Sequence, residues 1–366
     1  MHIRLLRIAI MNFNFPLLRP VRILLFPFSI LYAVIIWVRN FFYNKNILAS
    51  SSFNLPVICV GNLAAGGTGK SPMVEFLIKI LKGKFEIAIL SRGYKRKTKG
   101  YALADESSTA LDIGDEPMQF HSKFPEVSIA VGEERIVAIP QLLHDKPETK
   151  TIILDDAFQH RSVKAGLNIL LTDFNNLFTR DWYLPTGDLR DEKRSYKRAQ
   201  IIIVTKCPED ISQQQKWDTI KEINPLAAQQ IYFTSIKYGM PYHIVNRKEI
   251  LINNTTEVLL VTGIANPRPM KKYLQDNSKT YHQVSYNDHH IFTIDDLKEI
   301  IKRFSNITDR NKIILTTEKD AVRLIKFSSE IENLPFYVMP IEPKFLFDEE
   351  EKFAASVINY ITHFKN

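Results

Sequence analysis

The chain has 366 residues, of which 45% are hydrophobic and 24% are charged. These globular values argue against a disordered, collagen-like or polytopic membrane protein, and the length suffices for about two domains. The net charge is +8, but no Asp or Glu precedes Glu75, so the first 74 residues carry +7 and the other 292 carry +1. A surface that is basic all over, as on a nucleic-acid coat, is therefore disfavoured, and no nucleic-acid partner is expected.

An uncharged apolar run of sixteen residues, 23–38, lies between Arg22 and Arg39. It is shorter than the roughly 20 residues of a spanning helix, and Pro27 lies in its first turns. The absence of a small-x-small cleavage motif after it disfavours a signal peptide. A buried core helix is one interpretation. The flanking arginines and the aromatic residues that follow favour a helix at a membrane surface, and whether it spans the membrane or lies in the interface stays open.

A strand, a glycine-rich turn and a helix follow one another at residues 56–81. Residues 56–61 are apolar and β-branched, and from Ser71 the apolar residues recur with helical spacing. The Gly-Lys-Ser that opens the helix is typical of a nucleotide P-loop, in which backbone N–H groups hold phosphates, Lys70 reaches the β and γ oxygens and Ser71 ligates Mg²⁺. The predicted ATP-binding residues are Ala64, Ala65, Gly66, Gly67, Thr68, Gly69, Lys70 and Ser71.

Ala64 stands where the first glycine of the P-loop motif is usual. Gly66 and Gly67 are expected to supply the backbone freedom instead, because a residue without Cβ tolerates left-handed conformations. A glycine-rich turn in an unrelated strand–helix unit is the alternative interpretation, and the Gly-Lys-Ser triplet disfavours it.

Two adjacent carboxylates, Asp155 and Asp156, follow the apolar run 152–154. A P-loop requires an acidic residue at the end of a neighbouring strand to hold Mg²⁺, directly or through water. An aspartate that caps a helix is a competing interpretation for one of the two. His160 follows within about a turn and is expected to face the same crevice.

Further apolar runs at 86–94, 127–132, 166–173 and 199–206 alternate with helical stretches. This alternation predicts an α/β fold with a mostly parallel sheet that binds ligands at the carboxyl ends of its strands. The predicted organisation is a membrane-associated helical segment (1–45), a P-loop nucleotide-binding domain (46–225), a two-stranded linker (226–257) and a smaller second α/β domain (258–366).

Seven short motifs occur in a fixed order along the chain. They are GNLAAGGTGKSP at 61–72, SRGYKR at 91–96, GDEP at 114–117, LDDAFQH at 154–160, LPTGDLR at 184–190, NDHHIF at 287–292 and TTEKDAVRL at 316–324. This set resembles the tetraacyldisaccharide 4′-kinase family, membrane-associated P-loop kinases of lipid A synthesis. The resemblance covers nearly the whole chain.

The resemblance implies transfer of the γ-phosphoryl group of ATP, with Mg²⁺, to the 4′-hydroxyl of a tetraacyldisaccharide 1-phosphate. This lipid A precursor would become lipid IVA at the cytoplasmic face of the inner membrane. A membrane-tethered P-loop NTPase or regulator without lipid kinase activity is the alternative. The N-K-x-D motif with which a GTPase recognises guanine is absent. In the similar sequence TEKD at 317–320, Thr317 and Glu318 stand in place of the Asn-Lys pair.

The resemblance also assigns roles to individual residues. Asp115 is the expected catalytic base, and His289 is its expected partner from the second domain; Lys70 completes the catalytic set. The expected Mg²⁺ ligands are Ser71, Glu116, Asp155 and Asp156. The expected substrate-binding residues are Arg92, Tyr94, His160 and Arg190.

Overall fold

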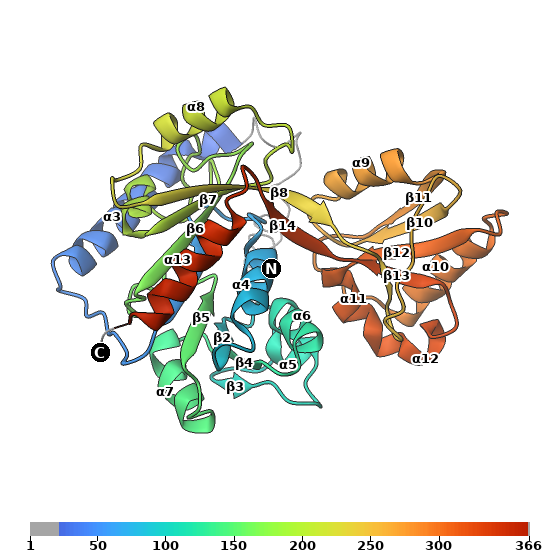
Figure 1. Ribbon diagram of the computed structural model, residues 1–366, viewed down its shortest axis with the longest axis horizontal. Coiled ribbons are helices and arrows are strands. Elements are labelled where there is room, and N and C mark those ends of the chain that lie inside the picture. Colours follow the sequence, from blue (N-terminus) through green and yellow to red (C-terminus); the bar gives the residue numbers. More distant parts are fainter. Residues whose placement is uncertain (1–21, 365–366) are drawn as a thin grey trace. The chain divides into compact units, whose positions relative to one another are not determined.

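The computed structural model describes residues 22–364, which form a mixed α/β protein with two mostly parallel sheets (Figure 1). The larger sheet has nine strands in the order β14-β8-β7-β6-β1-β5-β2-β4-β3. Their bounds are β1 (Val57–Asn62), β2 (Ile87–Ser91), β3 (Ala102–Leu103), β4 (Ser128–Val131), β5 (Thr151–Asp155), β6 (Leu167–Asp173), β7 (Ile201–Thr205), β8 (Gln230–Tyr238) and β14 (Ile341–Phe345). The smaller sheet has the order β11-β10-β12-β13-β9. Its strands are β9 (Tyr242–His243), β10 (Glu257–Thr262), β11 (Thr280–Ser285), β12 (Lys312–Thr317) and β13 (Phe336–Met339).

Helices occupy most of the remaining chain. Their bounds are η2 (Ile23–Leu25), α3 (Phe26–Asn44), α4 (Lys70–Leu81), α5 (Ala110–Ile113), α6 (Asp115–Lys123), α7 (Arg135–Asp145), η3 (Lys193–Arg198), α8 (Gln213–Ile223), α9 (Arg268–Asn277), α10 (Ile294–Ser305), α11 (Glu318–Leu324), η4 (Ile325–Phe327), α12 (Ser328–Ile331) and α13 (Glu350–Thr362). The predicted α/β alternation is confirmed, and each apolar run expected to be a strand overlaps one.

The chain divides into two compact units whose segments alternate along the sequence. Of the described residues, unit 1 comprises 22–70, 153–235 and 345–364, and unit 2 comprises 71–152 and 236–344. The P-loop is continuous across this division, which falls between Lys70 and Ser71. The domain boundaries expected at residues 45, 225 and 257 stay a prediction.

In unit 1 the strands pair in parallel through fully buried apolar residues. Ile58 of β1 lies opposite Leu167 of β6, and Ile169 of β6 lies opposite Ile201 of β7. Helix α13 packs on these strands (Figure 1), and the Tyr360 hydroxyl donates to the carbonyl oxygen of Val57. The parallel pairing brings the carboxyl ends of the strands, and the residues that follow them, to one edge.

In unit 2 the smaller sheet is covered by helices on both faces (Figure 1). Leu259 and Val261 of β10 face a core that includes Leu297 and Ile300 of α10. Their neighbours Val258 and Leu260 face the opposite core, with Met270 and Leu274 of α9. This alternation follows from the two-residue period of a strand, and burial on both faces is typical of a parallel sheet.

The segment 226–257 contains two strands, β8 and β9, that do not pair with each other. β8 pairs in parallel with β7, and β9 pairs antiparallel with β13. Alternating polarity indicates strands in this segment, but it does not specify the sheet to which each strand belongs.

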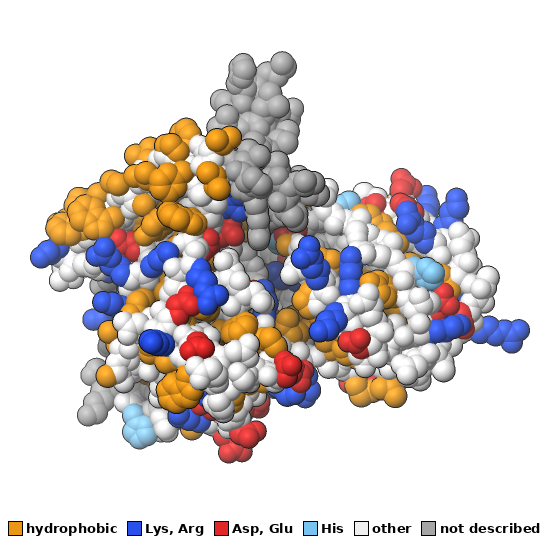
Figure 2. All heavy atoms as spheres, turned by 90° about the horizontal axis from the view of Figure 1, so that it is seen from above, with side chains coloured by type: hydrophobic (Ala, Val, Ile, Leu, Met, Phe, Trp, Pro, Cys, Tyr) orange, Lys and Arg blue, Asp and Glu red, His pale blue; other side chains and the backbone are white. Residues whose placement is uncertain are grey.

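The N-terminal apolar segment is a helix whose burial is inverted. Ile23–Asn44 spans 22 residues and is long and apolar enough to cross a membrane. Yet its buried residues are polar, namely Ser29 and Asn40, and Arg22 directly before it is buried as well. Most of its apolar residues are exposed, and Figure 2 shows a band of hydrophobic side chains at the upper left. Helix α3 therefore packs on unit 1 through its polar side and presents its apolar side to the surroundings.

Candidate active site

The P-loop joins β1 to α4 and has the local conformation that phosphate binding requires. Gly66 and Gly69 have φ of 109° and 84°, which residues with a Cβ rarely adopt. Ala64 is buried, and its φ is not positive, so alanine meets no backbone strain where the motif usually has glycine. Gly61 is needed for a different reason, because a Cβ there would lie 2.6 Å from the Cβ of Phe158.

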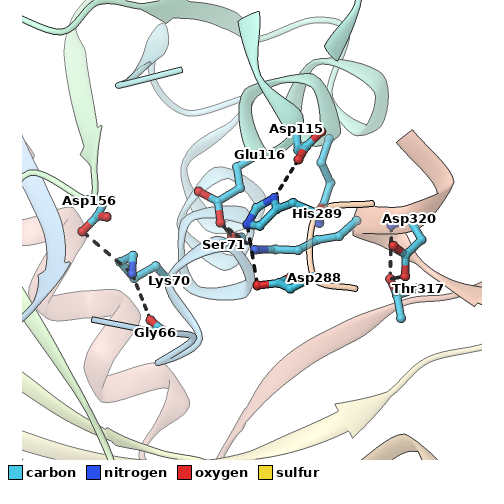
Figure 3. Close-up of polar contacts among 12 residues, drawn as sticks. Gly66, Lys70, Ser71, Asp115, Glu116, Asp156, Asp288, His289, Thr317 and Asp320 are labelled. Carbon is cyan, nitrogen blue, oxygen red and sulfur yellow. Dashed lines mark hydrogen bonds and ion pairs between the residues drawn. The ribbon is translucent and has the colours of Figure 1, made fainter. Parts of the chain in front are cut away.

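Lys70 points its ammonium group at the mouth of this loop (Figure 3). Its Nζ lies 3.5 Å from Oδ1 of Asn62, 3.5 Å from the carbonyl oxygen of Gly66 and 3.8 Å from Oδ1 of Asp156. Asn62 also donates to the Thr68 hydroxyl at 2.9 Å. Asn62 is not among the predicted site residues, although its position at the end of β1, directly before the turn, indicates a site residue.

Arg190 completes this group of residues in unit 1. Its Nη1 and Nη2 lie 3.2 and 2.5 Å from the two carboxylate oxygens of Asp156, a bidentate ion pair. Nη2 also donates to Asn62. Lys70 and Arg190 thus share the same two partners, and the pair of cations is suited to bind phosphate oxygens.

The two other predicted residues after β5 lie in the same unit. Asp155 is fully buried at the end of the strand. His160 is half-buried in the following turn, where its backbone N–H donates to the carbonyl oxygen of Ala157. Between them, the Gln159 amide donates to the carbonyl oxygen of Asn62 at 2.7 Å, which ties this turn to the start of the P-loop.

In unit 2, Glu116 lies between a hydroxyl and an ammonium group. The Ser71 hydroxyl lies 3.3 Å from Oε1 of Glu116, and Nζ of Lys319 donates to the same oxygen at 2.7 Å. Burial would lower the pKa of Lys319, but the charge and hydrogen bond of Glu116 outweigh burial and raise it. The structure thus brings together Ser71 and Glu116, two of the four predicted Mg²⁺ ligands.

Asp115 and His289 contact each other in unit 2, although 174 residues separate them in sequence (Figure 3). Oδ2 of Asp115, in the first turn of α6, lies 3.0 Å from Nδ1 of His289. His289 has a left-handed φ of 61°, and its N–H donates to the carbonyl oxygen of Gly263. The Tyr94 ring lies edge-on to the imidazole at 5.8 Å, whereas Arg92 is exposed beyond β2.

Arg323, which is not among the predicted site residues, contacts both Asp115 and His289. Its Nη2 donates to Oδ2 of Asp115 at 2.6 Å and lies 3.0 Å from Nδ1 of His289, and its Nη1 lies 3.3 Å from the buried Asp320. Burial would raise the pKa of Asp115, but the hydrogen bonds from His289 and Arg323 outweigh burial and lower it to about 2. Asp115 is therefore a carboxylate at neutral pH. The motif TTEKDAVRL could have indicated this residue, because Lys319 and Arg323 stand one helical turn apart in it and lie on one face of α11.

Carboxylates and hydroxyls are the hard oxygen donors that Mg²⁺ prefers, and the predicted ligands are all of this type. Within residues 22–364, no three His, Cys, Asp or Glu side chains converge on a metal site of their own. A P-loop cation needs no such cluster, because substrate phosphates and water fill most of its coordination sphere.

The α/β fold, the P-loop with its lysine and the ionised carboxylate define a P-loop protein built for phosphoryl transfer. The family model described as LpxK, tetraacyldisaccharide-1-P 4′-kinase, matches residues 21–362. The chain belongs to this family. The predicted P-loop fold and family are thereby confirmed.

Individual relatives agree with this assignment. The chain is 45% identical to the tetraacyldisaccharide 4′-kinase of Bacteroides thetaiotaomicron, with 92% of each chain covered. It is 44% identical to the enzyme of the same name from Flavobacterium johnsoniae, covering 93% of this chain and 97% of the relative. Among solved structures, it is similar to "apo" form LpxK from Aquifex aeolicus in complex with ATP. The TM-score is 0.72 at 28% identity, with 93% of this chain and 99% of the other covered.

Proposed function

We propose that the protein transfers the γ-phosphoryl group of ATP to the 4′-hydroxyl of a tetraacyldisaccharide 1-phosphate, the lipid A precursor. The family match over residues 21–362 carries this proposal. A P-loop NTPase that only regulates a partner is disfavoured, because relatives at 45% identity over nearly the whole chain are named as kinases of this acceptor.

Asp115 is the proposed base. An alcohol is a weak nucleophile at neutral pH, and a carboxylate placed within hydrogen-bond reach can accept its proton as the bond to phosphorus forms. The low pKa of Asp115 keeps the group ionised, and in a loose transition state the base mainly orients the hydroxyl. His289 contacts Oδ2 of Asp115. It is proposed to hold this carboxylate in place or to take up the proton that the carboxylate has accepted.

Charge neutralisation is proposed for the P-loop cations. Lys70 would bind the β and γ oxygens, and Arg190, which shares its partners, would bind a further phosphate oxygen. Arg92, Tyr94 and His160 are proposed to contact the substrates. Mg²⁺, held by Ser71 with Glu116, Asp155 or Asp156, would neutralise charge on the β and γ phosphates.

The exposed side of α3 is proposed to lie in the membrane at its cytoplasmic face. Polar contacts to unit 1 extend from Arg22 to Asn40, so the helix lies along the protein over about 27 Å. A helix fixed to the protein along one side is suited to lie in the interface with its other side in lipid rather than to span the bilayer. Lys45, exposed just after the helix, would attract anionic headgroups.

The direct test is incubation of the purified protein with Mg-ATP and a tetraacyldisaccharide 1-phosphate, followed by mass spectrometry of the lipid. The expected result is the gain of one phosphate, which NMR would locate at the 4′ position. ATP hydrolysis without a phosphorylated lipid would refute the kinase proposal and support an NTPase.

A further inference from the structure

Most polar contacts of α3 and of Arg22 just before it are made to residues 183–192, here named the 183–192 loop. Arg22 donates to Asp188 at 2.8 Å, and the Ser29 hydroxyl donates to that of Thr186 at 2.7 Å. Of the residues that make these contacts, Arg22 and Ser29 are nearly fully buried. The helix is thus attached to the loop through specific polar groups.

The same loop is hydrogen-bonded to the P-loop backbone. The N–H of Ala65 donates to the carbonyl oxygen of Asp188 at 2.6 Å, and the N–H of Arg190 donates to the carbonyl oxygen of Leu63 at 2.8 Å. A Cβ on Gly187 would lie 2.1 Å from the carbonyl oxygen of Trp182, so the loop closes on itself tightly. A close-packed loop of this kind transmits a displacement rather than absorbing it.

Two side chains of α3 form hydrogen bonds with Arg190 and with the residue that follows it. The Tyr32 hydroxyl donates to the carbonyl oxygen of Arg190 at 3.1 Å. The Asn40 amide donates to Oδ1 of Asp191, the next residue, at 2.7 Å. Asn40 and Asp191 are 2% and 1% exposed, and Arg161 donates to the Asn40 side-chain oxygen. The Tyr32 bond therefore fixes the backbone carbonyl of Arg190, whose guanidinium extends to Asp156, and the Asn40 bond fixes the side chain of the next residue.

We propose that Tyr32 and Asn40 are positioning residues for Arg190, so that the membrane-facing helix sets the geometry of the phosphate-binding arginine. The proposal rests on the proposed function in one respect, namely that the P-loop binds ATP. An arginine side chain has many rotamers, and fixing its backbone lowers the entropy lost when it binds a phosphate. The bound phosphate could belong to ATP or to the acceptor lipid, and the pairing of Arg190 with the partners of Lys70 favours ATP.

Tyr32→Phe is the main test variant, because it removes one hydroxyl and keeps the ring. Tyr43→Phe is its matched control on the same helix. The Tyr43 ring lies 5.2 and 5.0 Å from the guanidinium groups of Arg39 and Arg161, and its hydroxyl makes no hydrogen bond within residues 22–364. Each substitution is made in the full chain and again in an Arg190→Ala background.

The measured quantities are the dissociation constant for a fluorescent ATP analogue with Mg²⁺, by direct titration, and the KM for the acceptor lipid. We expect Tyr32→Phe to weaken binding of the analogue about threefold to tenfold, the loss of one hydrogen bond. In the Arg190→Ala background the same substitution should have no further effect, because the arginine side chain that Tyr32 positions is absent. Tyr43→Phe should match its parent in both backgrounds.

Each outcome decides the proposal. An effect that appears on the acceptor KM instead, and vanishes in Arg190→Ala, supports positioning and assigns the phosphate to the lipid. An effect of equal size in both backgrounds overturns the proposal, because Tyr32 would then act by stabilising the fold. No effect of Tyr32→Phe, or normal binding of both substrates by Arg190→Ala, overturns it as well. Absence of any ATP binding by the unmodified chain refutes the proposed function and the positioning role together.

Discussion

The Arg323 guanidinium donates to Asp115 at 2.6 Å from a position 208 residues further along the chain. The same guanidinium nitrogen lies 3.0 Å from Nδ1 of His289. Since arginine has only donors, neutral His289 can either accept from Arg323 or donate to Asp115 through Nδ1, but not both. The dyad expected from the family resemblance is thus a triad in this structure, and the arginine helps to lower the pKa of Asp115.

Asp115→Asn removes the proposed base while retaining its size. We expect kcat to fall by about 10²–10⁴ because the hydroxyl proton has no acceptor, with little change in ATP affinity. Steady-state kinetics at saturating lipid would measure this. Asp105→Asn, an exposed acid in the same unit, is the control and should behave as the unmodified protein. A change confined to KM would contradict the assignment of a base.

Arg323→Gln should alter the pH dependence of catalysis. Without the guanidinium, burial is opposed only by His289, so the pKa of Asp115 rises from about 2. Asp115 then becomes protonated at a higher pH, and the acidic limb of the pH profile of kcat/KM shifts to higher pH. Arg323→Lys keeps the charge and should shift the limb less. A pH–rate profile that is identical in the Gln variant and the unmodified protein would argue against any influence of Arg323 on the base.

Lys70→Ala should reduce kcat/KM by about 10²–10³, the usual loss when one donor to the transferring group is removed. The fold should survive, because the Lys70 ammonium contacts mainly the mouth of the P-loop. Lys79→Ala is a matched control on α4, since Lys79 is exposed and pairs with Glu342. Circular dichroism and coupled ADP release would test both variants, and unchanged turnover in Lys70→Ala would refute the P-loop assignment.

Glu75 makes the stability of the protein pH-dependent. Burial, reinforced by repulsion from Glu318, raises the pKa of Glu75 to about 7 despite its contacts with Lys123 and Gln119. The folded state therefore retains a proton that the unfolded state releases near pH 4.5. The free energy of unfolding should fall by roughly 3 kcal/mol as the pH rises from about 4.5 to 7 and level off above this range.

Glu75→Gln should remove this dependence and leave the Lys123–Glu318 ion pair intact. Urea unfolding at pH 5 and pH 8 would compare the two chains. Glu126→Gln, in which an exposed ion pair with Lys82 is lost, should keep the pH dependence of the unmodified protein. If the free energy of unfolding changed equally with pH in the Glu75→Gln variant and in the unmodified protein, a group other than Glu75 would be responsible for the pH dependence.

Val34→Glu should weaken binding to vesicles of phosphatidylethanolamine and phosphatidylglycerol about tenfold or more, since burial of a valine contributes about 1.5–3 kcal/mol. Val34 is 50% exposed on α3, and Val137 is equally exposed on α7, so Val137→Glu is the control. Neither substitution should change the melting temperature. Equal sedimentation of both variants with vesicles would place the lipid contact elsewhere.

The local elements of the fold were predictable because their signals are local. The P-loop and the acidic pair after β5 are contiguous patterns, and the apolar runs indicate strands by length and composition. The contact of Asp115 with His289 was expected from the family resemblance alone. Arg323 reaches the same carboxylate through the packing of α11 on α6, which no local pattern specifies. The polar side of α3 was predictable from the sequence, because Ser29 and Asn40 are eleven residues, or three helical turns, apart and therefore lie on the same face of the helix.

The inverted burial of α3 bears on how a water-soluble form of this protein should be made for inhibitor screening. Removal of residues 1–44 would take Arg22 from Asp188 and Asn40 from Asp191, leaving both carboxylates without these partners next to the nucleotide site. Polar substitutions on the outward side, at Ile30 or Ile35, retain every one of those contacts. Compounds selected against a truncated chain would meet an altered pocket, whereas a resurfaced helix preserves the native one.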